Sequence, residues 1–171
     1  MVDFHPLINR NFPRILTQLN RDPNTIHYGS FDRNWWHYKI RDFSSIILQQ
    51  GGYFLDLAAK LPEYNDYSKQ LHEYAAAAVN FWAGRAVRKG AFEEYYPWEN
   101  GYPPLAFSTL AVAKIILSQN LSVAKSGDAL KRAALKLQQR FEAKAANQQI
   151  AGLAALALLN KINPGIVNSL T

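Results

Sequence analysis

The sequence contains no cysteine, which excludes disulfide bonds and thiolate chemistry. It also lacks a long hydrophobic run. The longest strongly apolar stretch, residues 150–159, is far shorter than the about 20 residues that a membrane-spanning helix needs. The N-terminal residues have neither an uninterrupted apolar segment nor a small-residue cleavage site, so we predict no signal peptide. We therefore expect no membrane span, and the cytoplasm is the default location for a chain whose sequence fixes no other.

Acidic residues are the scarcer of the two charged classes. The chain has 19 Lys and Arg against 13 Asp and Glu, a net charge of +6, which favours acidic partners. Because it has no Gly-rich phosphate loop, zinc-ligand spacing or recognition-helix signature, we do not expect it to bind nucleic acid. An acidic polysaccharide fits the same positive charge. His5, His27 and His72 show no metal-ligand spacing, and we predict neither a metal ion nor another cofactor.

Apolar residues recur at helical spacing along most of the chain, and no segment alternates as a half-buried strand does. The spacing predicts helices over residues 32–50 with a continuation to 60, and over 66–89, 104–118, 128–143 and 149–159. The buried side of the helix at 128–143 is expected to carry Leu130, Ala133, Ala134, Leu137 and Phe141. Residues 1–27 are expected to be irregular, apart from a short helix near 13–19.

Two kinds of helix alternate in this pattern. The helices at 66–89 and 128–143 have one polar face, whereas those at 104–118 and 149–159 are apolar nearly all round and must be surrounded by protein. Amphipathic helices outside and apolar helices inside predict an all-α stack of α/α hairpins, a partial α/α toroid. We expect one domain over residues 1–171 that is a fragment of a larger toroid.

The loop at residues 90–103, GAFEEYYPWENGYP, combines aromatic and acidic residues and contains no basic residue. Pro103 and Pro104 suit the first turn of a helix, where a missing N–H costs nothing. Aromatic faces beside carboxylates at the start of a helix suit a polar, ring-shaped ligand the size of a sugar. The loop is therefore the first candidate for a binding site.

If the inner helices all run in one direction, the loops at 29–38, 90–103 and 144–148 lie at one end of the molecule. There we expect substrate to be bound by Trp35, Trp36, Tyr38, Glu94, Trp98, Glu99 and Gln148. Any catalytic chemistry is expected from Tyr95, Tyr96, His37 and Asn147. Structural alternatives stay open: Glu99 capping the next helix, Asn147 as an N-cap, and one of the two tyrosines in the core.

The segment GAFEEYYPWENGYPPLAFSTLAVAKIIL resembles a hairpin of the heparinase II/III-like group, which comprises α/α toroids of the polysaccharide-lyase type. DRNWWHYKIRDFSSIILQQ and ANQQIAGLAALALL are similar to neighbouring hairpins of that group, so the resemblance covers roughly residues 28–160. It implies an acidic polysaccharide substrate, with Asn147 neutralising a uronate carboxylate. The C5 proton would then be removed by a Tyr or His, here Tyr95, Tyr96 or His37.

In that group a His usually follows the Asn, whereas here Gln148 follows Asn147. We therefore expect binding or structural use rather than efficient catalysis. Lyase chemistry is the first enzymatic alternative, and glycoside hydrolysis by Glu94 and Glu99 is the second. The remaining alternative is a structural helical-repeat module, because a toroid cut after three hairpins leaves an apolar flank. A homo-oligomer, a C-terminal domain or a partner chain would cover that flank.

Overall fold

The structure, a computed structural model, describes residues 5–31, 45–89, 92–96 and 98–166. Its helices are α1 (His5–Gln18), α2 (Gly51–Ala58), α3 (Ser68–Lys89), α4 (Tyr102–Gln119), α5 (Gly127–Gln139) and α6 (Ala146–Ile162), with the short 3-10 helices η1 (Ile47–Gln50) and η2 (Pro62–Tyr67). Within these ranges, β pairing is limited to two isolated bridges. The prediction of an all-α chain is confirmed.

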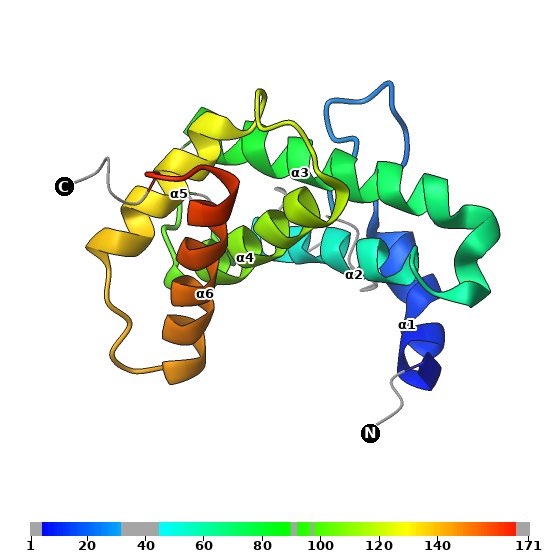
Figure 1. Cartoon of the computed structure of the whole chain (residues 1–171), viewed down its shortest axis with the longest axis horizontal. Helices are drawn as coiled ribbons and strands as arrows, with labels where there is room; N and C mark the ends of the chain where they lie inside the picture. The colour runs from blue at the N-terminus through cyan, green and yellow to red at the C-terminus, as the bar shows by residue number, and fades with distance from the viewer. Residues whose placement is uncertain (1–4, 32–44, 90–91, 97, 167–171) are drawn as a thin grey trace.

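Helices of the same kind pack against each other. The amphipathic helices α3 and α5 are in contact, the apolar helices α4 and α6 are in contact, and α2 packs on both α3 and α4. Figure 1 shows α3 along the upper side, α2 and α4 in a row beneath it, and α6 crossing α4 at the end away from α1. This arrangement is a stack of helical hairpins. The finer prediction, that the stack is part of a toroid, stays a prediction.

The core of the molecule lies where α3, α4, α5 and α6 meet. Its largest member, Trp82 of α3, is fully buried, and its indole Nε1 donates a hydrogen bond of 2.9 Å to Ser108 Oγ of α4. Leu105, Leu130 and Leu159, from α4, α5 and α6, are fully buried in the same cluster. A single buried polar contact inside an apolar cluster fixes how far α3 can slide along α4, because moving it would leave the indole N–H without an acceptor.

The N-terminal segment corrects the prediction that residues 1–27 are irregular. The helix α1 spans His5–Gln18 and continues through Pro13, which was expected near its start. The ring of Phe12 stacks on Tyr64 with centroids 4.3 Å apart and also contacts Phe54 of α2. Tertiary packing of the apolar side of α1 therefore outweighs the cost of an internal proline.

The helix α5 ends four positions earlier than its apolar spacing predicted, at Gln139 instead of 143. Four of the five residues expected on its buried side are buried: Leu130, Ala133, Ala134 and Leu137. Phe141 is 79% exposed, so its placement in the core was wrong. Arg140 has an extended backbone, and the turn that would have brought Phe141 onto the apolar stripe does not form.

The helix α6 corrects the expectation that an apolar helix is surrounded on every side. One stripe of it is covered by α4 and α5, with Ala151, Ala155 and Leu159 buried. On the opposite stripe Ile150 is 64% exposed and Leu153 is 55% exposed. Within the described part of the chain, this flank of the hairpin stack is open.

Candidate functional site

The candidate site is the segment from Phe92 to Gly101, which joins α3 to α4 and is called here the aromatic loop. Its two ends are tied together, because Gly101 N donates to Phe92 O over 3.1 Å. Phe92 itself is fully buried, with its ring 6.4 Å from that of Trp82 in the core. The loop is thus anchored at its base in the hydrophobic core.

Glu93 and Arg85 form a nearly buried ion pair that holds the aromatic loop to the end of α3. The Glu93 side chain is 1% exposed and the Arg85 side chain 18% exposed. The other carboxylate oxygen of Glu93 accepts the Trp98 backbone N–H at 2.9 Å. The Glu93 backbone carbonyl accepts a hydrogen bond from Ile46 N at 2.9 Å and another from Ser45 Oγ at 3.2 Å. One residue therefore connects three segments of the chain.

Sequence reasoning missed this pair, although a signal was present. In the sequence, Arg85 lies near the end of the helix predicted at 66–89, and Glu93 is one of three acids in the loop at 90–103. The signal is the position of Glu93. It directly follows the buried aromatic residue Phe92 and lies eight positions after Arg85 on the preceding helix.

Glu99 holds the outer turn of the aromatic loop. A single carboxylate oxygen, Oε2, accepts the backbone N–H groups of Glu94, Tyr95 and Tyr96 at 3.0, 2.7 and 3.3 Å. Glu99 therefore caps a turn of its own loop and not the helix that follows, whose N-cap is Gly101 without a side-chain hydrogen bond. The pairing of Glu94 with Glu99 as acid and base stays a prediction, although this carboxylate already has a structural task.

The aromatic residues of the outer turn point away from the core. Tyr95, Tyr96 and Trp98 are 57%, 72% and 69% exposed. The alternative that one of the two tyrosines lies in the core is therefore wrong. Trp98 has φ of 67°, a left-handed conformation that costs a non-glycine residue about 1 kcal/mol or more. The Glu93 carboxylate, which accepts the Trp98 backbone N–H, stabilises that conformation.

Basic side chains of α5 and of the residue that follows it lie against the aromatic loop. Lys136 Nζ donates to Asn100 Oδ1 over 3.0 Å, and an Arg140 guanidinium nitrogen donates to Asn100 O over 2.6 Å. Burial lowers the pKa of Lys136, and the positive charges of Arg140 and Arg132 lower it further. A lysine whose pKa is lowered by neighbouring cations sits in a region of positive potential, which attracts anions.

The start of α6 lies beside the start of α4, as expected if the loops that precede these helices lie at one end of the molecule. Tyr102 Oη donates to Gln149 Oε1 over 3.1 Å, and Tyr102 is pressed against Gly152, where a Cβ would lie 2.3 Å from the phenol oxygen. Asn147 is exposed and Gln148 is half-buried in the first turn of α6. Because the N-cap is Ala145, the interpretation of Asn147 as an N-cap was wrong.

The structure describes only residues 29–31 of the loop predicted at 29–38. Trp35, Trp36, His37 and Tyr38 lie outside the described residues. The segment that follows them does reach the aromatic loop, through the contacts of residues 45 and 46 with the Glu93 carbonyl.

Comparison of the chain with family models, with curated proteins and with solved structures found no match. The resemblance to the heparinase II/III-like group therefore depends on the sequence motifs alone. Among the described residues, no helix combines the length and apolar character that crossing a bilayer requires. In the same part of the chain, no group of three or more His, Cys, Asp or Glu side chains is placed to hold a metal ion.

Proposed function

We propose that the aromatic loop binds an acidic polysaccharide, and that this chain binds such a ligand rather than processing it efficiently. The observation that carries the proposal is the exposure of Tyr95, Tyr96 and Trp98 on a turn that carboxylates hold in place. A rigid turn presents aromatic faces without the entropy cost of ordering them on binding. Sugar rings have apolar faces that stack on such side chains, and the basic residues of α5 supply charge for uronate carboxylates.

Under this proposal Asn147 and Gln148, in the first turn of α6, contact the ligand as hydrogen-bonding groups. Trp35, Trp36, His37 and Tyr38 stay predicted members of the same site. Lyase chemistry by Tyr95 or Tyr96 would need a neighbouring cation to stabilise the phenolate, because an unperturbed tyrosine has a pKa of about 10. Binding makes no such demand, and it is the function that we infer.

The test compares uronate oligosaccharides with neutral oligosaccharides of the same length by isothermal titration calorimetry. Replacing Tyr96 or Trp98 with Ala should weaken uronate binding about tenfold, since covering one aromatic ring contributes about 1.5 kcal/mol or more. Tyr67, 60% exposed on η2, is the matched control, and Tyr67→Ala should bind as the unchanged chain does. Equal effects of all three substitutions would refute the assignment of the site.

The charge contribution has its own matched pair on α5. Lys136→Met should weaken binding and reduce its dependence on salt, because Lys136 belongs to the basic group beside the loop. Lys131→Met removes the same charge from an exposed position of the same helix and should leave binding nearly unchanged. If both variants lose the same affinity, only the net charge of the chain matters, and the local site is disproved.

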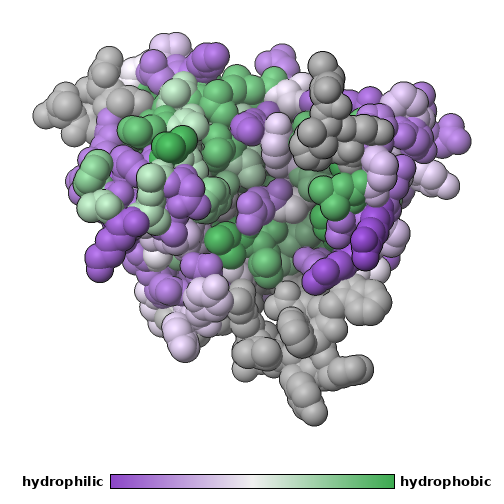
Figure 2. Space-filling view, turned by 90° about the horizontal axis from the view of Figure 1, so that it is seen from below, coloured by the Kyte–Doolittle hydropathy of each residue, from purple (hydrophilic) through white to green (hydrophobic). Residues whose placement is uncertain are grey.

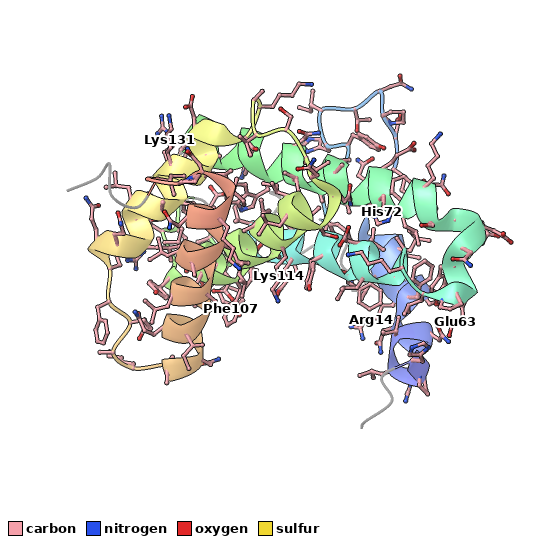
Figure 3. All side chains as sticks on the ribbon, in the orientation of Figure 1. Arg14, Glu63, His72, Phe107, Lys114 and Lys131 are labelled. Carbon is pink, nitrogen blue, oxygen red and sulfur yellow. The ribbon has the colours of Figure 1, made fainter. Side chains whose placement is uncertain are left out.

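A second candidate function, a helical module that self-associates, is supported by the open apolar flank of the hairpin stack. Ile150 and Leu153 of α6 and Leu117 of α4 are exposed. Figure 2 shows hydrophobic residues gathered on the face seen from below, and Figure 3 shows Phe107 and Lys114 of α4 pointing toward that side. Exposed apolar surface of this kind favours assembly.

Analytical ultracentrifugation tests this second candidate. We expect an oligomer that Ile150→Asp together with Leu153→Asp converts to a monomer, because two charges would then have to be buried in the contact. A chain that stays monomeric at all accessible concentrations would exclude it, whatever the result of the oligosaccharide titrations.

A further inference from the structure

A second polar cluster lies at the far end of α4 from the aromatic loop. Its centre is Asp56 of α2, whose side chain is completely buried. Asp56 Oδ1 accepts hydrogen bonds from His72 Nδ1 of α3 at 3.2 Å and from Gln119 Nε2 of α4 at 2.8 Å. Asp56 Oδ2 accepts one from Lys60 Nζ at 3.0 Å. The cluster therefore joins the ends of three helices.

The charge state of Asp56 decides how the histidine is oriented. Burial raises the pKa of Asp56, but hydrogen bonds from Gln119, Ser118 and Lys60, with the charge of Lys60, lower it below its ordinary value. At neutral pH the carboxylate is thus ionised and can only accept hydrogen bonds. The His72 Nδ1 must then carry the proton that it donates to Asp56, and in the neutral ring Nε2 is a bare lone pair.

Part of this imidazole is open to solvent. The His72 side chain is 33% exposed, and His72 lies on α3 on the side of α2 (Figure 3). Its ring lines a surface depression, whose other lining residues are Asn65, Ser68, Lys69, Glu73, Ala76 and Gln119. Among the described residues, none donates a hydrogen bond to Nε2. A carboxylate that fixes the tautomer of a histidine and leaves Nε2 toward water is the arrangement that makes imidazole a general base.

We propose that His72 is the general base of a second site, which hydrolyses small carboxylic esters, with Asp56 as its positioning residue. This inference does not depend on polysaccharide binding at the aromatic loop. Asn65 and Lys69 line the same depression, so their side-chain N–H groups are the donors that would stabilise negative charge on the carbonyl oxygen of a bound ester.

The reaction balances with water as the only co-reactant. The His72 Nε2 removes a proton from a water molecule while the water oxygen forms a bond to the ester carbonyl carbon. The tetrahedral intermediate collapses as the bond from that carbon to the alkoxy oxygen breaks, and the imidazolium returns its proton to the departing oxygen. The products are a carboxylic acid and an alcohol. The imidazole ends in its starting state, and no atom changes its oxidation state.

The first measurement is the tautomer of His72, read from long-range ¹H–¹⁵N NMR correlations of the folded chain at neutral pH. We expect the proton on Nδ1 and an unprotonated Nε2. A proton on Nε2 would overturn the proposal, because that nitrogen would then have no lone pair to act as a base. In a folded Asp56→Asn variant, the proton should move to Nε2, since an amide can donate to Nδ1.

The second measurement is the hydrolysis of p-nitrophenyl acetate by the full chain. His72→Gln should lower the rate by about 100-fold or more, the lower end of what a general base contributes. His27→Gln removes another exposed histidine and serves as the matched control, with no change expected. Equal rates for His72→Gln and the unchanged chain would overturn the proposal. If Asp56→Asn does not fold, the wild-type tautomer and the two histidine variants still decide the question.

Discussion

Replacing Arg85 with Met is the most informative single perturbation of the aromatic loop. It removes the cation from an ion pair whose carboxylate is 1% exposed, while keeping the aliphatic stem of the side chain in place. Glu93 would stay buried and would still accept the Trp98 backbone N–H, but without the cation that balances its charge. Breaking a buried pair by removing one partner costs about 3–5 kcal/mol, because an uncompensated charge is left inside.

The lower end of that range applies here, since the Arg85 side chain is 18% exposed and water reaches part of it. We therefore expect a loss of about 3 kcal/mol in the free energy of unfolding. For a chain of this size that corresponds to a fall in Tm of about 6–12 °C. Urea denaturation followed by far-ultraviolet circular dichroism, together with calorimetry, measures both quantities.

Two further variants make the reasoning refutable. Replacing both partners, Arg85→Met with Glu93→Gln, should recover most of the loss, because no buried charge then remains and the amide oxygen can still accept the Trp98 N–H. His5→Gln breaks a surface pair whose side chains are 47% and 39% exposed, and it should leave Tm unchanged. If Arg85→Met costs no more than His5→Gln, or if the double variant is less stable than the single one, the ion pair does not hold the loop.

Three other predictions concern the helix contacts. Gly152→Ala should destabilise the fold by about 1 kcal/mol or more, because the new Cβ would lie 2.3 Å from the Tyr102 phenol oxygen. Gly84→Ala, at an exposed position of α3, should instead stabilise the fold by about 0.5–1 kcal/mol. Urea titrations compare the two variants directly. Ser108→Ala leaves the buried Trp82 indole N–H without its acceptor and should cost about 1–3 kcal/mol in the same assay. The pKa of Asp56 is lowered in the folded state, so its contribution to stability is complete above about pH 4 and is lost as the pH falls through the lower folded value. Urea titrations at decreasing pH should therefore show a smaller acid destabilisation in Asp56→Asn than in the unchanged chain.

The helical pattern was predictable because burial of a periodic apolar stripe decides it. α3, α4 and α6 all overlap the segments predicted for them, and Pro103 and Pro104 occupy the first turn of α4 as expected. The prediction fails where local backbone geometry outweighs periodicity. Phe141 continues the apolar spacing of α5, but the chain turns before reaching it.

The candidate site was predictable only in part. Exposure of Tyr95 and Tyr96 follows from their place in a polar loop, but the two carboxylates that hold this loop have roles that spacing does not reveal. The part played by Glu93 depends on Arg85 from α3 and on the backbone of residues 45 and 46, which come together only once the helices have packed. Asp56 and His72 were not linked for the same reason, since α2 and α3 bring them together.

The most direct test of polysaccharide binding follows the tryptophan indole signals of ¹⁵N-labelled protein during titration with a uronate oligosaccharide. The indole of Trp98 should shift and saturate, since this side chain is 69% exposed on the aromatic loop. The indole of Trp82 should not move, because it is buried and bonded to Ser108. A Trp98 signal that stays in place at about 1 mM oligosaccharide, where even weak binding is populated, would contradict the proposed function.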